Sequence, residues 1–352
     1  MFKKILKEII NTKLETQRLI LRPITKKDLR IIFEMRNKKF VLSMMRTEEA
    51  LNYRSHIKWF KERENRIDYL IINKRNNKII GIINTVFFSK KNKLYAELGK
   101  YIGYKYYHGK GLGSEATKEW VNFIFTSTSI NYFFAQTLKS NFSNIKLNTK
   151  LGFRTLKNKN IDPNGVEWKT MKLTREKWEL KNKEILRNIY YCDLKKILVW
   201  RNSLKVREIS LDNAYITYDN HLKWYKKIQS NKSYHSYLLS LENNILGTVN
   251  LKQIKPKSAK WSIYKKPFSK KGIGSYLAYL VLNKIFYEMQ MNYVFASIYL
   301  TNNQSIQFHK SLGFDFKRKI NSNTSEFVLK KSSWKKSKNL IKKKIFAKYN
   351  IV

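Results

Sequence analysis

Two short segments of the chain combine glycine with lysine and serine in an order suited to binding phosphate groups. Residues 110–114 read Lys-Gly-Leu-Gly-Ser, and residues 271–275 read Lys-Gly-Ile-Gly-Ser. Glycine lets a backbone approach a pyrophosphate closely and present successive N–H groups, and a helix that begins there adds a favourable dipole. A Gly-x-Gly step also occurs in ordinary tight turns, so the loops alone leave both interpretations open.

The place of the loops in the chain excludes two familiar phosphate-binding motifs. A dinucleotide-binding fingerprint needs Gly-x-Gly-x-x-Gly directly after the first strand of its unit, whereas both loops come late. A Walker loop needs Gly-Lys followed by Ser or Thr, and neither loop has this order. Dehydrogenase and P-loop kinase functions are therefore excluded.

The loops belong to a repeat that spans most of the chain. Gly111 and Gly272 lie 161 residues apart, and a Leu-Gly-Phe triplet follows each at the same distance. Further upstream, three pairs of segments recur: Arg36-Asn37 with Arg201-Asn202, His56–Lys61 with His221–Lys226, and Gly81–Asn84 with Gly247–Asn250. A period this long indicates a duplicated domain rather than a solenoid.

The late glycine loop, followed by Asn-x-x-x-Ile and Leu-Gly-Phe, resembles the GNAT superfamily of N-acetyltransferases over nearly the full length of both copies. The resemblance implies that the loop binds the acetyl-CoA pyrophosphate and that the asparagine flanks the pantetheine arm. His108 and Ser269 stand where the family has Gln or Arg at the head of the loop. The implied cofactor-binding residues are Lys110, Gly111, Leu112, Gly113, Ser114 and Asn141, with Lys271, Gly272, Ile273, Gly274, Ser275 and Asn302 in the second copy.

The front half of each copy narrows the resemblance to two branches. The second copy looks like the flagellin-sugar branch, which acetylates the 4-amino group of a UDP-linked sugar on the way to pseudaminic acid. The implied substrate-binding residues are Arg201, Asn202, Arg207, His221 and Trp224. The first copy shares this signature, but its 18–23 and 109–116 segments also look like the ribosomal-protein N-acetyltransferase branch.

Acetyl transfer needs a proton for the departing thiolate, and the superfamily often supplies it from a tyrosine four residues before the Gly of Gly-Phe. His309 occupies that position in the second copy and Asn148 in the first. Histidine can carry a proton near neutral pH and asparagine cannot, so His309 is the predicted donor and the second copy the predicted better catalyst. A histidine on the helix surface beside a ligand pocket is the alternative.

The general base is less clearly indicated. Glu97, on the strand leading into the first loop, stands where many relatives have a carboxylate. Lys260 takes the matching place in the second copy, where Ser297 also stands in a position often held by Glu. Either copy can therefore have become structural.

His221 and Trp224 lie three residues apart, on one face of an expected helix. Such a pair can contact a nucleotide-sugar ring, and it can equally belong to a buried amphipathic helix. No cluster of histidine, cysteine and carboxylate residues has metal-ligand spacing, so no metal is expected.

Composition limits the partners and the location. The formal net charge is +47, but lysines are spread along the whole chain with much Ile, Asn, Tyr and Phe, a pattern typical of AT-rich genomes. We therefore expect no specific nucleic-acid partner. The one cysteine, Cys192, and the lack of a long apolar run or a signal-like N-terminus predict a cytoplasmic protein without a membrane span.

Hydrophobic periodicity places strands before each loop and helices after it. The expected first-copy strands are 14–23, 69–72, 79–83, 97–102, 132–138 and 168–173, with helices from 114 and over 141–150. The expected second-copy strands are 190–200, 237–241, 245–251, 260–265, 293–300 and 326–330, with helices over 276–288 and 305–312. This order predicts an α/β fold, two tandem acyl-CoA N-acyltransferase domains, each a mixed, mostly antiparallel sheet flanked by helices.

The predicted boundaries are 13–178 for the first domain, 183–335 for the second and 336–352 for a basic C-terminal tail. The predicted function is acetyl-CoA-dependent N-acetylation of a small-molecule amine, a UDP-linked 4-amino-sugar. The alternatives are N-terminal acetylation of a protein, such as a ribosomal protein, and a CoA-binding pseudoenzyme or scaffold. The sequence does not indicate the oligomeric state.

Overall fold

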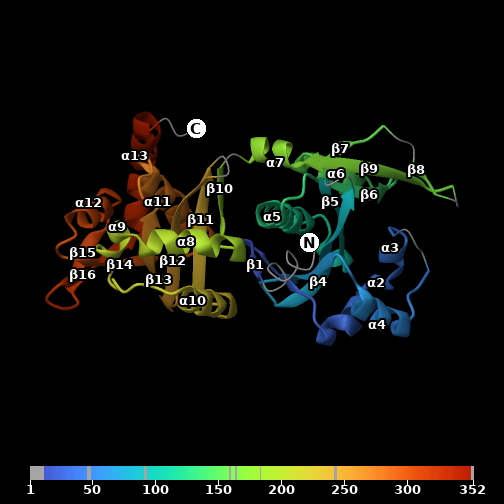
Figure 1. The fold of residues 1–352 in the computed structure, drawn as a ribbon, viewed down its shortest axis with the longest axis horizontal. Coiled ribbons are helices and arrows are strands. Elements are labelled where there is room, and N and C mark those ends of the chain that lie inside the picture. The colour runs from blue at the N-terminus through green and yellow to red at the C-terminus, as the bar shows by residue number, and fades with distance from the viewer. Residues whose placement is uncertain are drawn as a thin grey trace. The chain divides into compact units, whose positions relative to one another are not determined.

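A computed structural model describes residues 12–45, 49–90, 93–157, 160–162, 165–182, 184–241 and 244–349. It divides into two compact units (Figure 1). Unit 1 comprises residues 1–182 and 190–192, and unit 2 comprises residues 183–189 and 193–352. Residues 350–352 of the predicted tail lie outside the described residues.

Unit 1 is built on a nine-stranded sheet with the order β1-β2-β3-β4-β5-β6-β9-β7, in which β8 also pairs with β9. Its strands are β1 (Leu14–Glu15), β2 (Leu19–Pro23), β3 (Arg66–Asn73), β4 (Lys78–Lys90), β5 (Lys93–Ile102), β6 (Tyr132–Leu138), β7 (Arg154–Thr155), β8 (Asn160–Ile161) and β9 (Glu167–Thr174). Its helices are η1 (Lys26–Asp28), α2 (Leu29–Arg36), α3 (Lys39–Leu42), α4 (Tyr53–Glu62), η2 (Lys105–Tyr107), α5 (Leu112–Ser127), α6 (Phe142–Leu151) and α7 (Arg175–Lys181).

Unit 2 repeats this plan on a seven-stranded sheet with the order β10-β11-β12-β13-β14-β16-β15. Its strands are β10 (Glu184–Asn188), β11 (Tyr234–Leu241), β12 (Asn244–Lys255), β13 (Ser258–Lys265), β14 (Tyr293–Tyr299), β15 (Asp315–Lys319) and β16 (Thr324–Lys330). Its helices are η3 (Tyr191–Asp193, which unit 1 shares), α8 (Leu194–Asn202), α9 (Leu204–Arg207), α10 (Tyr218–Ser230), α11 (Ile273–Asn283), the π-helical η4 (Lys284–Glu288), α12 (Asn303–Ser311) and α13 (Lys331–Tyr349).

The sheet of unit 1 is covered on both faces. In β3, Tyr69 and Ile71 pack into the core that includes α5, whereas Leu70 and Ile72 pack into a second cluster with residues of α2 and α4. Successive strand residues point to opposite faces, so this alternation requires helices on both. The predicted α/β fold with mixed, mostly antiparallel sheets is confirmed.

Each sheet contains one parallel pair of neighbouring strands, and these strands diverge. β5 and β6 pair only over Tyr95–Glu97 with Tyr132–Phe134, although β5 continues to Ile102. β13 and β14 likewise pair over Ser258–Lys260 with Tyr293–Phe295 before separating. We call the region between the diverging ends, with the helix that follows β6 or β14, the wedge of each unit.

Two sequence predictions about unit 2 differ from the structure. The strand expected over 190–200 is wrong: η3 and α8 occupy this segment, because Leu194, Ile197 and Trp200 recur every three residues and are all buried. The boundary expected at 335 falls inside α13. Trp334, Ile341 and Ile345 of this helix are buried in the core of unit 2, so the basic segment completes the domain.

Candidate functional site

The glycine loop of unit 1 ends at the first turn of α5. Gly109 and Gly111 have φ values of +71° and +75°, a region that L-residues with side chains rarely adopt. Glu115 N–H donates to the Gly111 carbonyl at 3.0 Å as the first backbone bond of α5. The N–H groups of Leu112, Gly113 and Ser114 precede it and face out of the helix end, where an anion is stabilised by the helix dipole.

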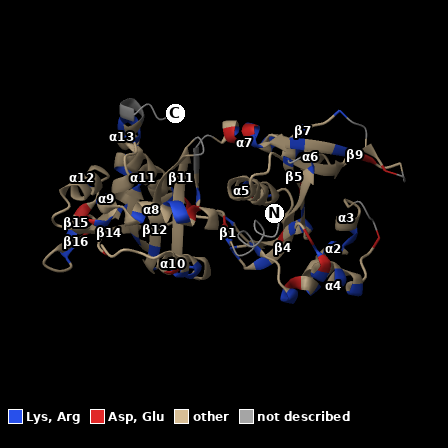
Figure 2. Cartoon of the chain, in the orientation of Figure 1, with Lys and Arg blue, Asp and Glu red and all other residues tan. Residues whose placement is uncertain are grey.

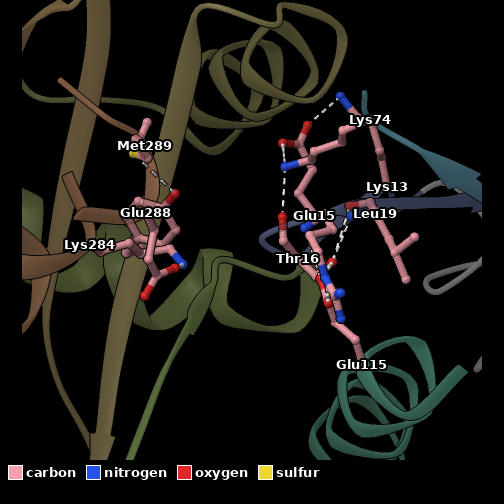
Figure 3. A network of polar contacts seen from close by, with 11 residues as sticks. Lys13, Glu15, Thr16, Leu19, Lys74, Glu115, Lys284, Glu288 and Met289 are labelled. Carbon is pink, nitrogen blue, oxygen red and sulfur yellow. Dashed lines mark hydrogen bonds and ion pairs between the residues drawn. The ribbon is translucent and has the colours of Figure 1, made fainter. Parts of the chain in front are cut away.

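A side-chain network joins this loop to the first strands, and Figure 3 shows Thr16 and Glu115 within it. Arg18 donates to Glu115 from its backbone N at 2.8 Å and from Nε at 2.6 Å, and its Nη1 donates to the Lys110 carbonyl at 2.8 Å. Thr16 Oγ1 donates to the same Glu115 carboxylate. Burial alone raises the pKa of Glu115, but the hydrogen bonds from Thr16 and Arg18 hold it below the ordinary value. The charged network therefore fixes the loop to β2.

The loop of unit 2 is shorter. Gly272, at a φ of +96°, again precedes the helix, and Tyr276 N–H donates to its carbonyl at 2.9 Å. The backbone N–H of Gly103 at the end of β5 donates to Ile80, and that of Lys266 at the end of β13 donates to Leu246, so the two residues are equivalent. Gly111 lies eight positions after Gly103, whereas Gly272 lies only six positions after Lys266. A positive φ of +60° falls on the exposed Phe268 instead of a second glycine. Unit 2 therefore keeps one of the two left-handed glycines.

The two asparagines of the Asn-x-x-x-Ile motif cap helices. Asn141 Oδ1 accepts from Asn144 N at 3.1 Å at the start of α6, and Asn302 Oδ1 accepts from Ser305 N at 2.9 Å at the start of α12. This is the ordinary N-cap role of asparagine. Each amide oxygen therefore has one acceptor site engaged in the cap, and the amide nitrogen is the group that can donate to a cofactor.

In unit 1, a lysine–asparagine pair crosses the wedge. Lys100 lies on β5 three residues beyond the last parallel pairing, and its Nζ donates to Asn148 Oδ1 on α6 at 2.9 Å. Asn148 is fully buried, and its Nδ2 faces Met171 Sδ on β9 at 3.8 Å. Burial lowers the pKa of Lys100 to about 7. Sequence reasoning missed this lysine, because only the fold brings it beside Asn148.

In unit 2, a neutral aromatic pair takes the corresponding place. Trp261 Nε1 on β13 donates to His309 Nε2 at 3.2 Å, and His309 Nδ1 lies 2.8 Å from the Ser305 carbonyl. A carbonyl oxygen only accepts, so Nδ1 carries the proton and Nε2 carries none. Burial lowers the pKa of His309 to about 4. The predicted proton donor therefore has its one proton committed to Ser305, which favours the structural interpretation of His309.

This arrangement predicts a pH-dependent stability of unit 2. An unfolded histidine binds a proton near pH 6.5, whereas folded His309 binds one only near pH 4, so acid favours the unfolded state. The free energy of unfolding should fall by about 3 kcal/mol between pH 7 and pH 4 from this residue. His309→Asn, which copies Asn148, should remove that part of the slope in urea titrations. An unchanged slope would show that His309 is already protonated or exposed in the folded chain.

The base candidates lie at the mouth of the wedges. Glu97 is the last residue of β5 that pairs with β6, and it is partly exposed on the face opposite Ala96 and Leu98. Lys260 occupies the same register position in unit 2, pairing with Phe295. Ser297 Oγ is buried in β14 without a hydrogen-bond partner. Of these three residues, only Glu97 has a carboxylate that can act as the predicted base.

Of the predicted substrate-binding residues, Asn202 and Arg207 hold a loop. Asn202 Nδ2 donates to the Ile216 carbonyl at 2.8 Å and its Oδ1 accepts from Ile216 N at 2.9 Å. Asn37 makes the same reciprocal pair with Leu51 in unit 1. Arg207 Nε donates to the Asn213 carbonyl at 2.8 Å. The amide group of Asn202 is therefore occupied, and a substrate contact from it would require this loop to open.

His221 and Trp224 stack on each other, with ring centroids 4.9 Å apart and an interplanar angle of 16°. His56 and Trp59 repeat the stack in unit 1 at 5.2 Å and 16°. Both histidines are buried, which lowers their pKa, and the Nε2 atom of each has no hydrogen-bond partner. Each stacked pair is thus part of the helix packing, and the histidine Nε2 atom in each is left without a hydrogen-bond partner.

An arginine–tyrosine pair, of which the sequence analysis missed the tyrosine, recurs in both units. Arg36 and Tyr101 in unit 1 are close enough to influence each other's pKa, and Arg201 in unit 2 is close enough to lower the pKa of Tyr264. Burial raises the pKa of both tyrosines. Arg36 Nη1, Arg201 Nη1 and Tyr101 Oη are buried without partners. The signal that could have revealed the tyrosines is their recurrence one residue before the end of β5 and of β13, the strands that lead into the glycine loops.

Among the described residues, no group of three or more His, Cys, Asp or Glu side chains is placed to hold a metal ion. In the same part of the chain, none of the helices has the length and apolar character required to cross a membrane.

Comparisons with known proteins agree with this architecture. Two sequence models described as acetyltransferase (GNAT) domains match residues 18–154 and 186–327. An uncharacterized protein of Methanocaldococcus jannaschii is 30% identical over 149 residues, covering 41% of this chain and 29% of that protein. The chain thus spans less than a third of that relative's length.

Acetyltransferase PseH of Campylobacter jejuni is 24% identical over 122 residues, covering 35% of this chain and 76% of PseH. A crystal structure of PseH in complex with acetyl coenzyme A is similar at 21% identity and a TM-score of 0.35, covering 42% of this chain and 98% of that one. Because the two family models account for both units, the chain belongs to the GNAT acetyltransferase family and consists of two tandem domains of that family.

Proposed function

We propose that the chain is an acetyl-CoA-dependent N-acetyltransferase whose turnover resides in unit 1. The observation that carries the proposal is the left-handed glycine loop at the start of α5, next to strands that separate. A Cβ atom placed on Gly109 would meet nothing within 4 Å, and one on Gly113 only side-chain carbons at 3.6 Å and beyond, so the backbone N–H groups are approachable. Acetyl-CoA, when bound, supplies the acetyl group as a thioester.

The acceptor that we propose is an anionic amine such as a nucleotide-linked amino sugar. Buried donors without partners are uncommon in folded proteins and call for a ligand or water. Arg36 Nη1 and Tyr101 Oη supply two such donors, and the net charge of +47 favours approach of an anion. The sequence resemblance to the flagellin-sugar branch supports the 4-amino-sugar class, and the similarity to acetyltransferase PseH supports acetyl transfer. The expected cytoplasmic location remains a prediction.

The structure bears differently on the two alternative functions, N-terminal acetylation of a protein and a CoA-binding pseudoenzyme. The segment that resembles the ribosomal-protein branch contains Arg18 and Arg22, and both have structural roles: Arg18 holds the loop and Arg22 forms an ion pair with Asp28. These contacts do not favour a protein acceptor. The pseudoenzyme alternative gains support for unit 2, where the Trp261–His309 pair stands in the wedge.

Lys and Arg lie on elements throughout both units (Figure 2), which suits non-specific attraction of polyanions.

The test of the cofactor assignment is calorimetric titration of the whole chain with acetyl-CoA. We expect two sites per chain, the tighter one in unit 1, because each unit keeps a glycine loop at a helix N-terminus. The enthalpy should not depend on added metal. A chain that binds no acetyl-CoA at millimolar concentration would contradict the proposed function.

The acceptor assignment predicts an effect of Arg36. Arg36→Gln should raise the KM for a UDP-linked amino sugar about 10-fold or more, because a charged hydrogen bond to a phosphate contributes about 1.5–3 kcal/mol. The affinity for acetyl-CoA should stay the same. Arg201→Gln in unit 2 is the matched control and should leave KM unchanged if turnover resides in unit 1. An effect of Arg201→Gln alone would place the acceptor in unit 2.

A further inference from the structure

The wedge of unit 1 contains a titratable side chain, that of Lys100. Lys100 lies with Ala96 and Leu98 on the face of β5 that packs into the main core, yet its side chain keeps partial exposure. Its Nζ crosses to α6 through the hydrogen bond to Asn148. A lysine directed into a core normally costs stability, so its presence at this point calls for a function.

The environment of Lys100 makes it a usable acid. Burial is the cause of its lowered pKa of about 7. Its hydrogen-bond partner Asn148 is uncharged, and so is Met171, which contacts Asn148. The carboxylate of Glu97 stands on the opposite face of β5. An ordinary lysine with a pKa near 10.4 releases its proton poorly at neutral pH, whereas one near 7 matches the conditions that favour general acid catalysis.

The position of Lys100 also suits a role at the thioester. If unit 1 binds acetyl-CoA as proposed above, the pyrophosphate lies at the start of α5, and the rest of the cofactor extends toward the wedge beside β5 and α6. The Lys100–Asn148 hydrogen bond crosses the wedge between these two elements. Asn148 stands four residues before Gly152, where the resemblance to the family implied a proton donor.

We propose that Lys100 is the proton donor to the departing CoA thiolate in unit 1, and that Asn148 is the positioning residue that orients its ammonium group. This inference rests on the proposed function. The Trp261–His309 pair of unit 2 holds no equivalent proton, which assigns turnover to unit 1, against the sequence prediction that the second copy is the better catalyst.

The neutral acceptor amine forms a C–N bond to the thioester carbonyl carbon, and the C–S bond breaks with its electron pair remaining on sulfur. The Lys100 ammonium gives one proton to that sulfur and becomes a neutral amine. The acceptor nitrogen loses one proton to solvent, and Lys100 regains one from solvent before the next cycle. The products are an amide and the CoA thiol.

The experiment follows the titration of Lys100 by NMR in whole chain labelled with 13Cε-lysine, and Lys100→Arg assigns the signal. The Gly274→Glu background confines ligand binding to unit 1. We expect a midpoint near pH 7 in the free chain and a midpoint about one pH unit higher with CoA than with acetyl-CoA, because only CoA can place a thiolate beside the ammonium. Equal midpoints with the two ligands would overturn the donor role.

Turnover supplies the second readout. Lys100→Met and Lys100→Arg should each lower kcat about 100-fold on a UDP-linked amino sugar while changing the acetyl-CoA Kd less than about 2-fold. Arginine keeps the charge but does not release a proton, so it separates proton donation from electrostatic binding. Asn148→Ala should shift the Lys100 midpoint, and the exposed Lys118→Met is the control.

Full turnover in Lys100→Arg would contradict the inference while leaving the proposed function intact. If the Gly274→Glu chain binds no acetyl-CoA while the wild-type chain does, the assignment of turnover to unit 1 fails, and the donor role fails with it. If neither chain binds acetyl-CoA, the proposed function itself fails.

Discussion

Glutamate in place of Gly113 is expected to weaken binding of acetyl-CoA to unit 1 about 100-fold or more and to abolish turnover. The new carboxylate would stand in the first turn of α5, against the pyrophosphate. Two like charges about 4 Å apart near a protein surface repel by about 4 kcal/mol. The fold should tolerate the change, because the nearest atoms to a Cβ at this position are Leu147 Cδ1 at 3.6 Å and Ile102 Cγ1 at 3.9 Å. Calorimetry with acetyl-CoA measures the loss.

Gly274→Glu provides the matched variant in unit 2. The nearest atom to a Cβ there is Phe308 Cε2 at 3.8 Å, so the change is equally tolerable. It should remove the weaker site and leave turnover near the wild-type value. Lys118→Gln changes the net charge by the same amount on an exposed face of α5 and should leave binding unaltered. Retained affinity at the tighter site in Gly113→Glu would place the pyrophosphate elsewhere.

Asp193→Asn is expected to destabilise unit 2 by about 3–5 kcal/mol. Arg187 and Asp193 form a bidentate pair, with N–O distances of 2.6 and 2.9 Å, and each side chain is only 3% exposed. Removing one charge leaves a buried guanidinium uncompensated, which costs much more than the pair itself contributes. The exchange of β10 and β16 amides measured by hydrogen–deuterium mass spectrometry reports the stability of unit 2.

The duplicated pair in unit 1 is the control. Arg22 and Asp28 have the same bidentate geometry, with both distances at 2.8 Å, but Arg22 is 34% exposed. Water can solvate this arginine when its partner is lost, so Asp28→Asn should cost less than about half as much in unit 1. Equal losses in the two units would show that burial does not decide the contribution of this pair.

The sequence predicts the architecture well because the signals are local and appear twice. The glycine loops and the order of strands and helices lie where the spacing predicted them, apart from the segment over 190–200. The misplaced strand over 190–200 has a clear cause. Its run of apolar residues can be interpreted as a strand or a helix, and the buried spacing of Leu194, Ile197 and Trp200 decides for the helix.

The site was less predictable, because its key contacts join residues distant in the chain. The proximity of Lys100 to Asn148, and of Trp261 to His309, depends on the divergence of two parallel strands. The sequence shows His309 at the family's donor position, but it does not show that Trp261 donates a hydrogen bond to the second ring nitrogen of His309. It likewise shows Lys100 as a charged residue within a strand, but it does not show that Lys100 contacts Asn148 at the donor position.

Transfer of a 13C-labelled acetyl group from acetyl-CoA to a panel of UDP-linked 4-amino-sugars is the most direct test of the account. We predict an N-acetylated sugar as the product with the wild-type chain and with Gly274→Glu, and none with Gly113→Glu. Loss of the product in Gly274→Glu alone would place catalysis in unit 2. Bound acetyl-CoA without transfer to any amine of the panel, spermidine and a peptide N-terminus included, would contradict the assignment as an N-acetyltransferase.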